Sequence, residues 1–110
     1  MKNYLILYRS PLARQAAMAT ATPEEQMEGM KPWLAWRDRV GNKMVDFGAP
    51  TAGSAKSTKN NPWESAKSEI SGYSIVQATD VDSVKSLFLD HPHTSTFEDT
   101  TIEIHECVNM

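Results

Sequence analysis

The segment Asn3–Arg9, with the sequence Asn-Tyr-Leu-Ile-Leu-Tyr-Arg, constrains the fold most. Its apolar and aromatic residues occupy both faces of a strand, and a strand of this kind is buried on both sides. We therefore expect residues 3–9 to form a central strand. Helices should cover one face of its sheet, and a second apolar layer should cover the other.

The stretch Thr22-Pro23-Glu24-Glu25 predicts the start of a helix. The threonine hydroxyl can accept a hydrogen bond from the backbone of the second glutamate, whose side chain can reach back in turn. Apolar residues at helical spacing extend this helix from Glu24 to Val40. Pro32 should kink it, and Gly41 should end it as a left-handed cap.

The remaining elements follow in a simple order. Further strands are predicted at 43–47, 72–78 and 101–107. A second helix is predicted at 81–88, where Pro92 stops it, and one helical turn is predicted around Ala13–Met18. The segments 51–71 and 94–100 are predicted to be loops. The 51–71 loop is long enough to be functional or mobile. The order β-α-β-β-α-β is that of the α+β ferredoxin-like fold, an antiparallel sheet with two helices on one face.

The strands carry more apolar surface than one sheet face can hide: Leu5, Leu7, Val45, Phe47, Tyr73 and Ile75. An exposed apolar patch of several hundred Å² usually marks an interface. A chain of 110 residues forms one domain, 1–110, of modest stability, which self-association would increase. We predict a homodimer with its sheets packed face to face.

Composition excludes several classes of protein. The net charge is −3, without a basic cluster or basic amphipathic helix, so we expect neither nucleic acid nor a membrane surface as partner. No stretch approaches the roughly 20 apolar residues of a membrane helix. Cys107 is the one cysteine, which excludes a thiolate metal site and suggests a cytoplasmic location. The histidine spacing indicates no metal, and we expect no cofactor.

Asp46 is the first candidate for a catalytic role. It lies in the stretch 43–50, between Val45 and Phe47 of an otherwise apolar strand. Enclosure there would raise the pKa of the carboxyl group and suit it to acid–base chemistry. Alternatively, the side chain points outward or accepts hydrogen bonds from the turn at Gly48.

Two histidines are further catalytic candidates. His91 can turn into a cleft and orient a substrate or Asp46, whereas His93 more plausibly caps the preceding helix. His105 lies on the strand face opposite the core helices, where it can bind an anion or relay a proton in the dimer cavity. It can equally pair with a neighbouring glutamate.

Three residues are candidates for substrate binding: Tyr8, Arg9 and Trp63. Arg9 ends the first strand and can bind a carboxylate or form a surface salt bridge. Trp63 is an indole within a polar loop, so it either anchors that loop or covers a pocket. The spacing of Trp33 and Trp36 is more typical of core residues.

Six stretches resemble, in the same order, those of YCII-related domains: Tyr4-Leu5-Ile6-Leu7-Tyr8, Thr22-Pro23-Glu24-Glu25-Gln26-Met27, Val45-Asp46-Phe47-Gly48-Ala49-Pro50, Gly72-Tyr73-Ser74-Ile75-Val76, His91-Pro92-His93 and Ile102-Glu103-Ile104-His105-Glu106. The resemblance implies a dimeric α+β barrel of ferredoxin-like subunits with a cleft beside the barrel. It implies no single reaction, although a few members resemble ring-opening or dehalogenating enzymes.

Some members of that family use a His–Asp pair, with the histidine on the first helix and the aspartate on the next strand. Asp46 matches the aspartate, but the helix from Glu24 to Val40 contains no histidine, which leaves His91 or His105 to supply the imidazole. Two functions stay open. One is acid–base catalysis on a small polar or aromatic acid, with residues 51–71 as a lid, and the other is a non-catalytic dimeric module that binds a ligand or a protein.

Overall fold

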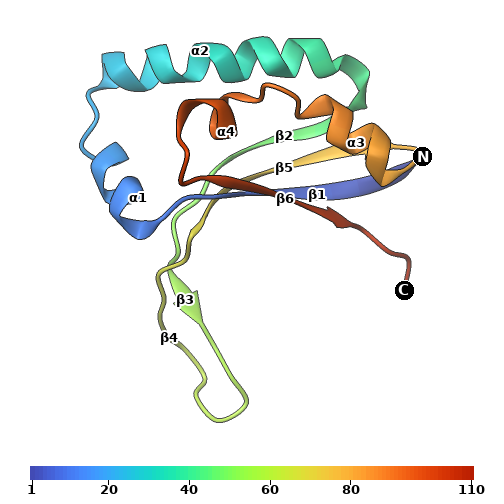
Figure 1. Ribbon diagram of the computed structural model, residues 1–110. Coiled ribbons are helices and arrows are strands. Elements are labelled where there is room, and N and C mark those ends of the chain that lie inside the picture. The colour runs from blue at the N-terminus through green and yellow to red at the C-terminus, as the bar shows by residue number, and fades with distance from the viewer.

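Four strands form one antiparallel sheet in the order β2-β5-β1-β6 (Figure 1). A computed structural model describes residues 1–110. The strands are β1 (Lys2–Arg9), β2 (Met44–Pro50), β5 (Ile70–Ala78) and β6 (Thr101–Glu106). Because β1 pairs with β5 on one side and β6 on the other, the prediction of a central first strand is confirmed. The strand order and antiparallel pairing are those of the ferredoxin-like fold.

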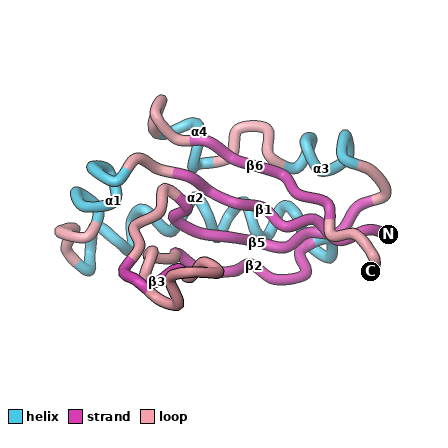
Figure 2. Tube along the Cα trace, turned by 90° about the horizontal axis from the view of Figure 1, so that it is seen from below, coloured by secondary structure: helices cyan, strands magenta, loops and turns pink.

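The helices are α1 (Leu12–Met18), α2 (Pro23–Val40), α3 (Val81–Leu87) and α4 (Pro92–Thr96), and a 3₁₀ turn, η1 (Gly41–Lys43), joins α2 to β2. Three of the helices, α2, α3 and α4, lie on one side of this sheet, and α1 lies beyond its end (Figure 1). The view from below shows that the opposite sheet face carries no helix (Figure 2). No helix is both long and apolar enough to cross a membrane.

The start of α2 is the predicted capping box. Thr22 Oγ1 accepts from the Glu25 backbone N–H at 3.1 Å, and the Glu25 carboxylate accepts from the Thr22 N–H at 3.3 Å. The helix runs unbroken through Pro32 and is followed by Gly41. The φ of Gly41 is positive, 64°, but its ψ of −131° lies outside the left-handed region, so the predicted left-handed cap is wrong. The capping box is a local feature, so the sequence around it suffices to predict it.

The region around Pro92 differs from the prediction. We expected Pro92 to stop the second helix and residues 94–100 to form a loop, but α3 already ends at Leu87, and Pro92 is the first residue of α4. The reason is that proline suits the first turn of a helix, where its missing N–H has no partner to lose. The short helix α4 places His91, its N-terminal cap, beneath α2.

Helices cover one face of the sheet and leave the other face uncovered. Tyr4, Ile6 and Tyr8 of β1 are buried beneath the helices, together with Val76 of β5. Alternate residues face the other way and stay partly exposed. They form two cross-strand pairs, Leu5 with Ile75 and Leu7 with Tyr73. We call this uncovered side the open face.

Strand β2 is irregular, and for this reason the prediction that Phe47 contributes to the uncovered apolar face is wrong. Its pairing with β5 shifts twice, around Asp46, so the alternation of faces breaks. Gly48 has a φ of 80°, and a Cβ built on it would lie 1.8 Å from the Tyr73 carbonyl oxygen, which only glycine can avoid. As a result, Phe47 lies on the helix side, with its ring centroid 6.5 Å from that of Trp36.

Residues 51–69, which belong to the segment 51–71 predicted as a loop, form a hairpin that we call the arm. It contains the short strands β3 (Ala55–Lys56) and β4 (Glu64–Ser65), which pair with each other. The arm continues the β2–β5 pair beyond the end of the sheet and projects away from the helices (Figure 1). All residues from 51 to 65 are exposed.

Candidate functional site

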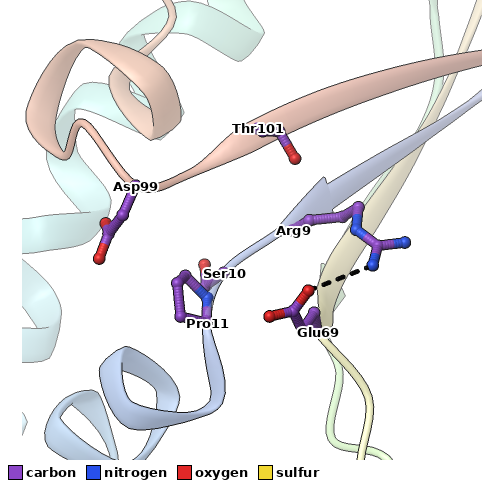
Figure 3. A pocket seen from close by; sticks show the side chains of 6 residues that line it. All are labelled: Arg9, Ser10, Pro11, Glu69, Asp99 and Thr101. Carbon is purple, nitrogen blue, oxygen red and sulfur yellow. Dashed lines mark hydrogen bonds and ion pairs between the residues drawn. The ribbon is translucent and has the colours of Figure 1, made fainter.

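A hollow of about 190 Å³ lies at one end of the sheet (Figure 3). Six residues line it: Arg9, Ser10, Pro11, Glu69, Asp99 and Thr101. At this end β1 leaves the sheet while β5 and β6 begin, and Arg9 pairs with Ile70 on one side and Thr101 on the other. Antiparallel pairing therefore gathers residues that are far apart in the sequence.

Arg9 is the cation of this pocket and is held by two carboxylates. Its Nη2 lies 3.4 Å from Glu69 Oε1, and its Nη1 lies 3.4 Å from Glu103 Oε2. Figure 3 shows the pair with Glu69. Glu103 stands opposite Leu7 on the open face, so Arg9 connects the pocket to that face. Partly exposed pairs of this kind contribute only about 0–1 kcal/mol each, so an incoming anion can exchange with them at small cost.

The opposite wall of the pocket is held by a bidentate ion pair. Arg14 binds the two carboxylate oxygens of Asp99 at 2.7 and 3.1 Å, and the hydrogen bond from Arg14 lowers the pKa of that carboxyl group. Ser10, which also lines the pocket, is held by a hydrogen bond, because its buried hydroxyl lies 3.1 Å from the Ser71 hydroxyl. The pocket is thus preformed in the single subunit.

Asp46 lies on the open face near the opposite edge of the sheet. Its Oδ1 accepts from the Gly48 N–H at 2.8 Å, and its Oδ2 accepts from the Tyr73 hydroxyl at 3.3 Å. We considered that Asp46 could accept hydrogen bonds from the turn at Gly48, and the structure shows such a bond. The expected enclosure between Val45 and Phe47 is wrong for the single subunit, because Asp46 is exposed and Phe47 lies on the helix side.

His91 lies on the other side of the sheet, inside the helix layer. Its Nδ1 accepts from the His93 backbone N–H at 3.0 Å, so the ring proton belongs on Nε2. This Nε2 is buried and has no hydrogen-bond partner among protein groups. Four aromatic rings surround the imidazole, those of Tyr8, Trp33, Trp36 and Phe88.

This environment keeps His91 neutral. Burial disfavours the imidazolium, and the nearby His93 and Arg39 add positive charge, so the pKa of His91 falls to about 3. Tyr8 is also buried, and the loss of solvent raises the pKa of its phenol. The Tyr8 hydroxyl lies 2.9 Å from the Ser74 hydroxyl, so Tyr8 does not reach the pocket that its neighbour Arg9 lines.

His105 and Trp63 occupy two further positions. His105 stands opposite Leu5 on the open face, and its Nε2 lies 2.9 Å from Glu103 Oε1. The structure therefore shows the pairing with a glutamate that we considered for His105. Trp63 is 74% exposed on the arm and lines neither the pocket at Arg9 nor the hollow at the base of the arm.

The candidate residues thus separate into groups. Arg9, Glu103 and His105 form a connected polar cluster on the open face beside the pocket. Asp46 is on the strand at the other edge, two strand spacings from the strand of Arg9 and three, or about 14 Å, from the strand of Glu103 and His105. His91 is on the other face. No three side chains of the His, Cys, Asp and Glu types lie close enough to hold a metal ion.

Sequence reasoning missed most of the pocket lining: Ser10, Pro11, Glu69, Asp99 and Thr101. The predicted strand order could have identified two of these residues. Once β1 is placed between β5 and β6 as antiparallel neighbours, the residues after β1 must lie beside those that precede β5 and β6. The boundaries of β5 and β6 then point to Glu69 and Thr101.

No protein-family model matches the chain, and no curated protein matches it. Among solved structures, the chain is similar to the 5-chloro-2-hydroxyhydroquinone dehydrochlorinase of Burkholderia phenoliruptrix AC1100, determined in complex with 2,5-dihydroxybenzoquinone. The sequences are 21% identical, the TM-score is 0.52, and the match covers 92% of this chain and 90% of the other. The fold is therefore α+β, of the ferredoxin-like type. At this level of identity the likeness concerns the fold alone.

Proposed function

We propose that this protein is a dimeric, YCII-like small-molecule-binding protein of one domain, whose cleft lies where the Arg9 pocket meets the open face. One observation carries the proposal. Arg9 both lines the pocket and pairs with Glu103 of the open face. A second copy packed on that face would leave the pocket at the rim of the interface, which turns an open hollow into a cleft.

The distribution of side chains on the open face supports the dimer. Two cross-strand apolar pairs, Leu5–Ile75 and Leu7–Tyr73, lie in its centre, and charged residues of β2 and β6 flank them. Covering apolar surface contributes about 25 cal/mol per Å² removed from water. An apolar centre with a polar rim is the usual arrangement of an interface.

The chemistry of the pocket favours a small polar or aromatic acid as ligand. The planar guanidinium of Arg9 matches the geometry of a carboxylate, and Thr101 of β6, which is paired with Arg9, lines the same pocket. The dehydrochlorinase of similar fold was solved with an oxygenated ring compound, which favours a ligand of similar size here.

Acid–base chemistry is the enzymatic form of this proposal. Asp46 would accept a proton, and an imidazole would orient or protonate the substrate. Within one subunit no histidine reaches Asp46, so His105 of the second copy is the candidate for that role. His91 would act from the helix side of the sheet, as the residue that holds α4 and the strand end at Arg9 in place.

A non-catalytic binding module is the second candidate. The separation of Asp46 from both candidate histidines favours it, since general acid–base catalysis requires groups within about one hydrogen bond or one bridging water of the substrate atoms.

The variant Asp46→Asn distinguishes the catalytic from the non-catalytic function. Loss of turnover with retained ligand binding supports catalysis, whereas unchanged turnover contradicts a role for Asp46.

Ligand binding itself is tested by calorimetric titration with a panel of small aromatic and aliphatic acids. Arg9→Gln should weaken the binding of any acid that the wild type binds by at least tenfold. Lys31→Gln is the matched control, because it removes one positive charge from an exposed pair with Glu28 on α2. Equal affinities of the wild type and Arg9→Gln would place the site elsewhere.

A further inference from the structure

The arm is an ordered hairpin without a covering surface. Its two short strands pair at Ala55 with Ser65 and at Lys56 with Glu64, and the Thr58 N–H donates to the Asn61 carbonyl at 2.7 Å across the tip. An isolated two-stranded hairpin is at best marginally stable in water. The arm also exposes Trp63, whose indole has more apolar surface than almost any other side chain. It therefore needs a surface to pack against.

The base of the arm is fixed to its own subunit. Gln15 of α1 donates to the Ser68 carbonyl at 2.8 Å, and the Ala66 N–H donates to the Ser54 carbonyl at 3.2 Å. Gly53 lies so close to residues 66–68 that an added Cβ would be 2.7 Å from the Ser68 nitrogen. These contacts direct the arm outward.

The direction of the arm indicates what it packs against. Figure 1 shows that it passes the level of the sheet on the side away from the helices, and Figure 2 shows it standing toward the viewer from the open face. A second copy seated on the open face would occupy the space beside it. Trp63 lines neither the pocket at Arg9 nor the hollow at the base of the arm, so it does not act as a lid on either of them.

We propose that the arm clasps a second copy of this chain, and that Trp63 is buried against that copy. This inference rests on the dimer of the proposed function and assigns the arm a role within it. Arms from two copies related by a two-fold axis would each hold the other subunit, which makes the interface self-complementary and closed.

The size of the open face supports this assignment. β1 is eight residues long, and at about 3.4 Å per residue and about 4.8 Å per strand the four-stranded face covers roughly 500 Å². Stable interfaces bury about 800 Å² on each partner. The arm adds contact area beside this footprint, which brings the interface of two copies closer to the size of a stable one.

Charges on the two surfaces are largely balanced within each subunit. In the arm, Lys56 lies 3.6 Å from Glu64. On the rim of the open face, Glu103 pairs with Arg9 and Glu106 pairs with Lys2. The contact between arm and partner would therefore depend on the apolar surface of Trp63 and of the open face rather than on a difference in net charge.

The test uses the full chain labelled with 5-fluorotryptophan. The chain has three tryptophans, and the ¹⁹F resonance of Trp63 is the one that Trp63→Phe removes. The H₂O/D₂O shift of that resonance should show a shielded indole in the dimer. It should show an exposed indole in Leu7→Asp, which breaks the open face, and in the wild type diluted below its dissociation constant. The dilution series covers the case in which Leu7→Asp does not fold.

Sedimentation equilibrium supplies the second readout. Trp63→Ala should raise the dimer dissociation constant at least tenfold, and Trp63→Phe should restore most of the affinity. An indole exposed in an intact dimer, or equally shielded in dimer and monomer, would overturn the clasp and leave the dimer standing. A wild type that stays a single chain at all concentrations would overturn the dimer and the clasp together.

Discussion

The ring of His91 stacks on the ring of Tyr8, with centroids 5.3 Å apart and planes inclined by 17°. The contact joins the N-terminal cap of α4 to the central strand. His93, two residues further on, places its Nε2 2.9 Å from the Arg9 carbonyl oxygen. The two histidines therefore hold the strand end from which Arg9 reaches the pocket, and their state should affect both stability and binding.

Acid should destabilise the protein through His91. Its pKa is about 3 in the folded chain and about 6.5 when unfolded, so below pH 6.5 the unfolded chain binds a proton that the folded chain does not. The free energy of unfolding should fall by about 1.4 kcal/mol per pH unit from this group as pH drops toward 3. His93, whose pKa is also lowered by burial, acts in the same direction. Urea unfolding at pH 7.5 and 5 measures the slope.

A variant that cannot titrate isolates the contribution of His91. His91→Asn keeps an acceptor for the His93 N–H but binds no proton, so the slope of the free energy of unfolding against pH should decrease by about 1.4 kcal/mol per pH unit. A His91→Asn slope equal to that of the wild type would show that His91 is not the titrating group.

Gly48→Ala should be strongly destabilising. The new Cβ would meet the Tyr73 carbonyl oxygen, and alanine disfavours the φ of 80°, so we expect a loss of about 2–4 kcal/mol. Gly29→Ala is the matched control in α2, where no atom lies within 4 Å of the added methyl group, and it should stabilise by about 0.5–1 kcal/mol. Thermal and urea unfolding compare the two, and equal effects would contradict the close approach at Gly48.

The Tyr8–Ser74 hydrogen bond should be energetically coupled. Ser74 is fully buried, lies 2.9 Å from the Tyr8 hydroxyl and donates to the Phe47 carbonyl at 2.6 Å. Ser74→Ala should cost about 1–3 kcal/mol, because it leaves two polar groups without a partner. A double-mutant cycle with Tyr8→Phe should give a coupling of at least about 0.5 kcal/mol. Additive single effects would mean that the two hydroxyls do not stabilise each other.

Leu7→Asp should produce a monomer at concentrations where the wild type is a dimer. A carboxylate in the centre of the open face would have to lose its hydration in the interface, which is unfavourable without a partner charge. Leu89→Asp is the control, since Leu89 is 73% exposed and outside the sheet. Light scattering over a dilution series gives both masses. Dimeric Leu7→Asp would show that the subunits do not pair through this face.

The site was less predictable than the fold. Arg9 was chosen from its place at a strand end, and it does line the pocket. The face on which Asp46 lies depends on the double shift of β2 against β5, which no property of residues 43–50 encodes. His91 was a candidate either for capping the preceding helix or for a cleft, but a new helix at Pro92 turns it into the core.

The sequence by itself determined the order of the four sheet strands and of the helices α2 and α3 between them, the capping box at Thr22 and the central place of β1. Those features depend on neighbours within a few residues or on the periodicity of apolar side chains. Only the tertiary structure decided which residues meet: Arg9 with Glu69 and Glu103, His91 with Tyr8, and none of the histidines with Asp46. Such contacts depend on strand register and on the packing of distant segments, and a one-residue shift in register moves a side chain to the opposite face.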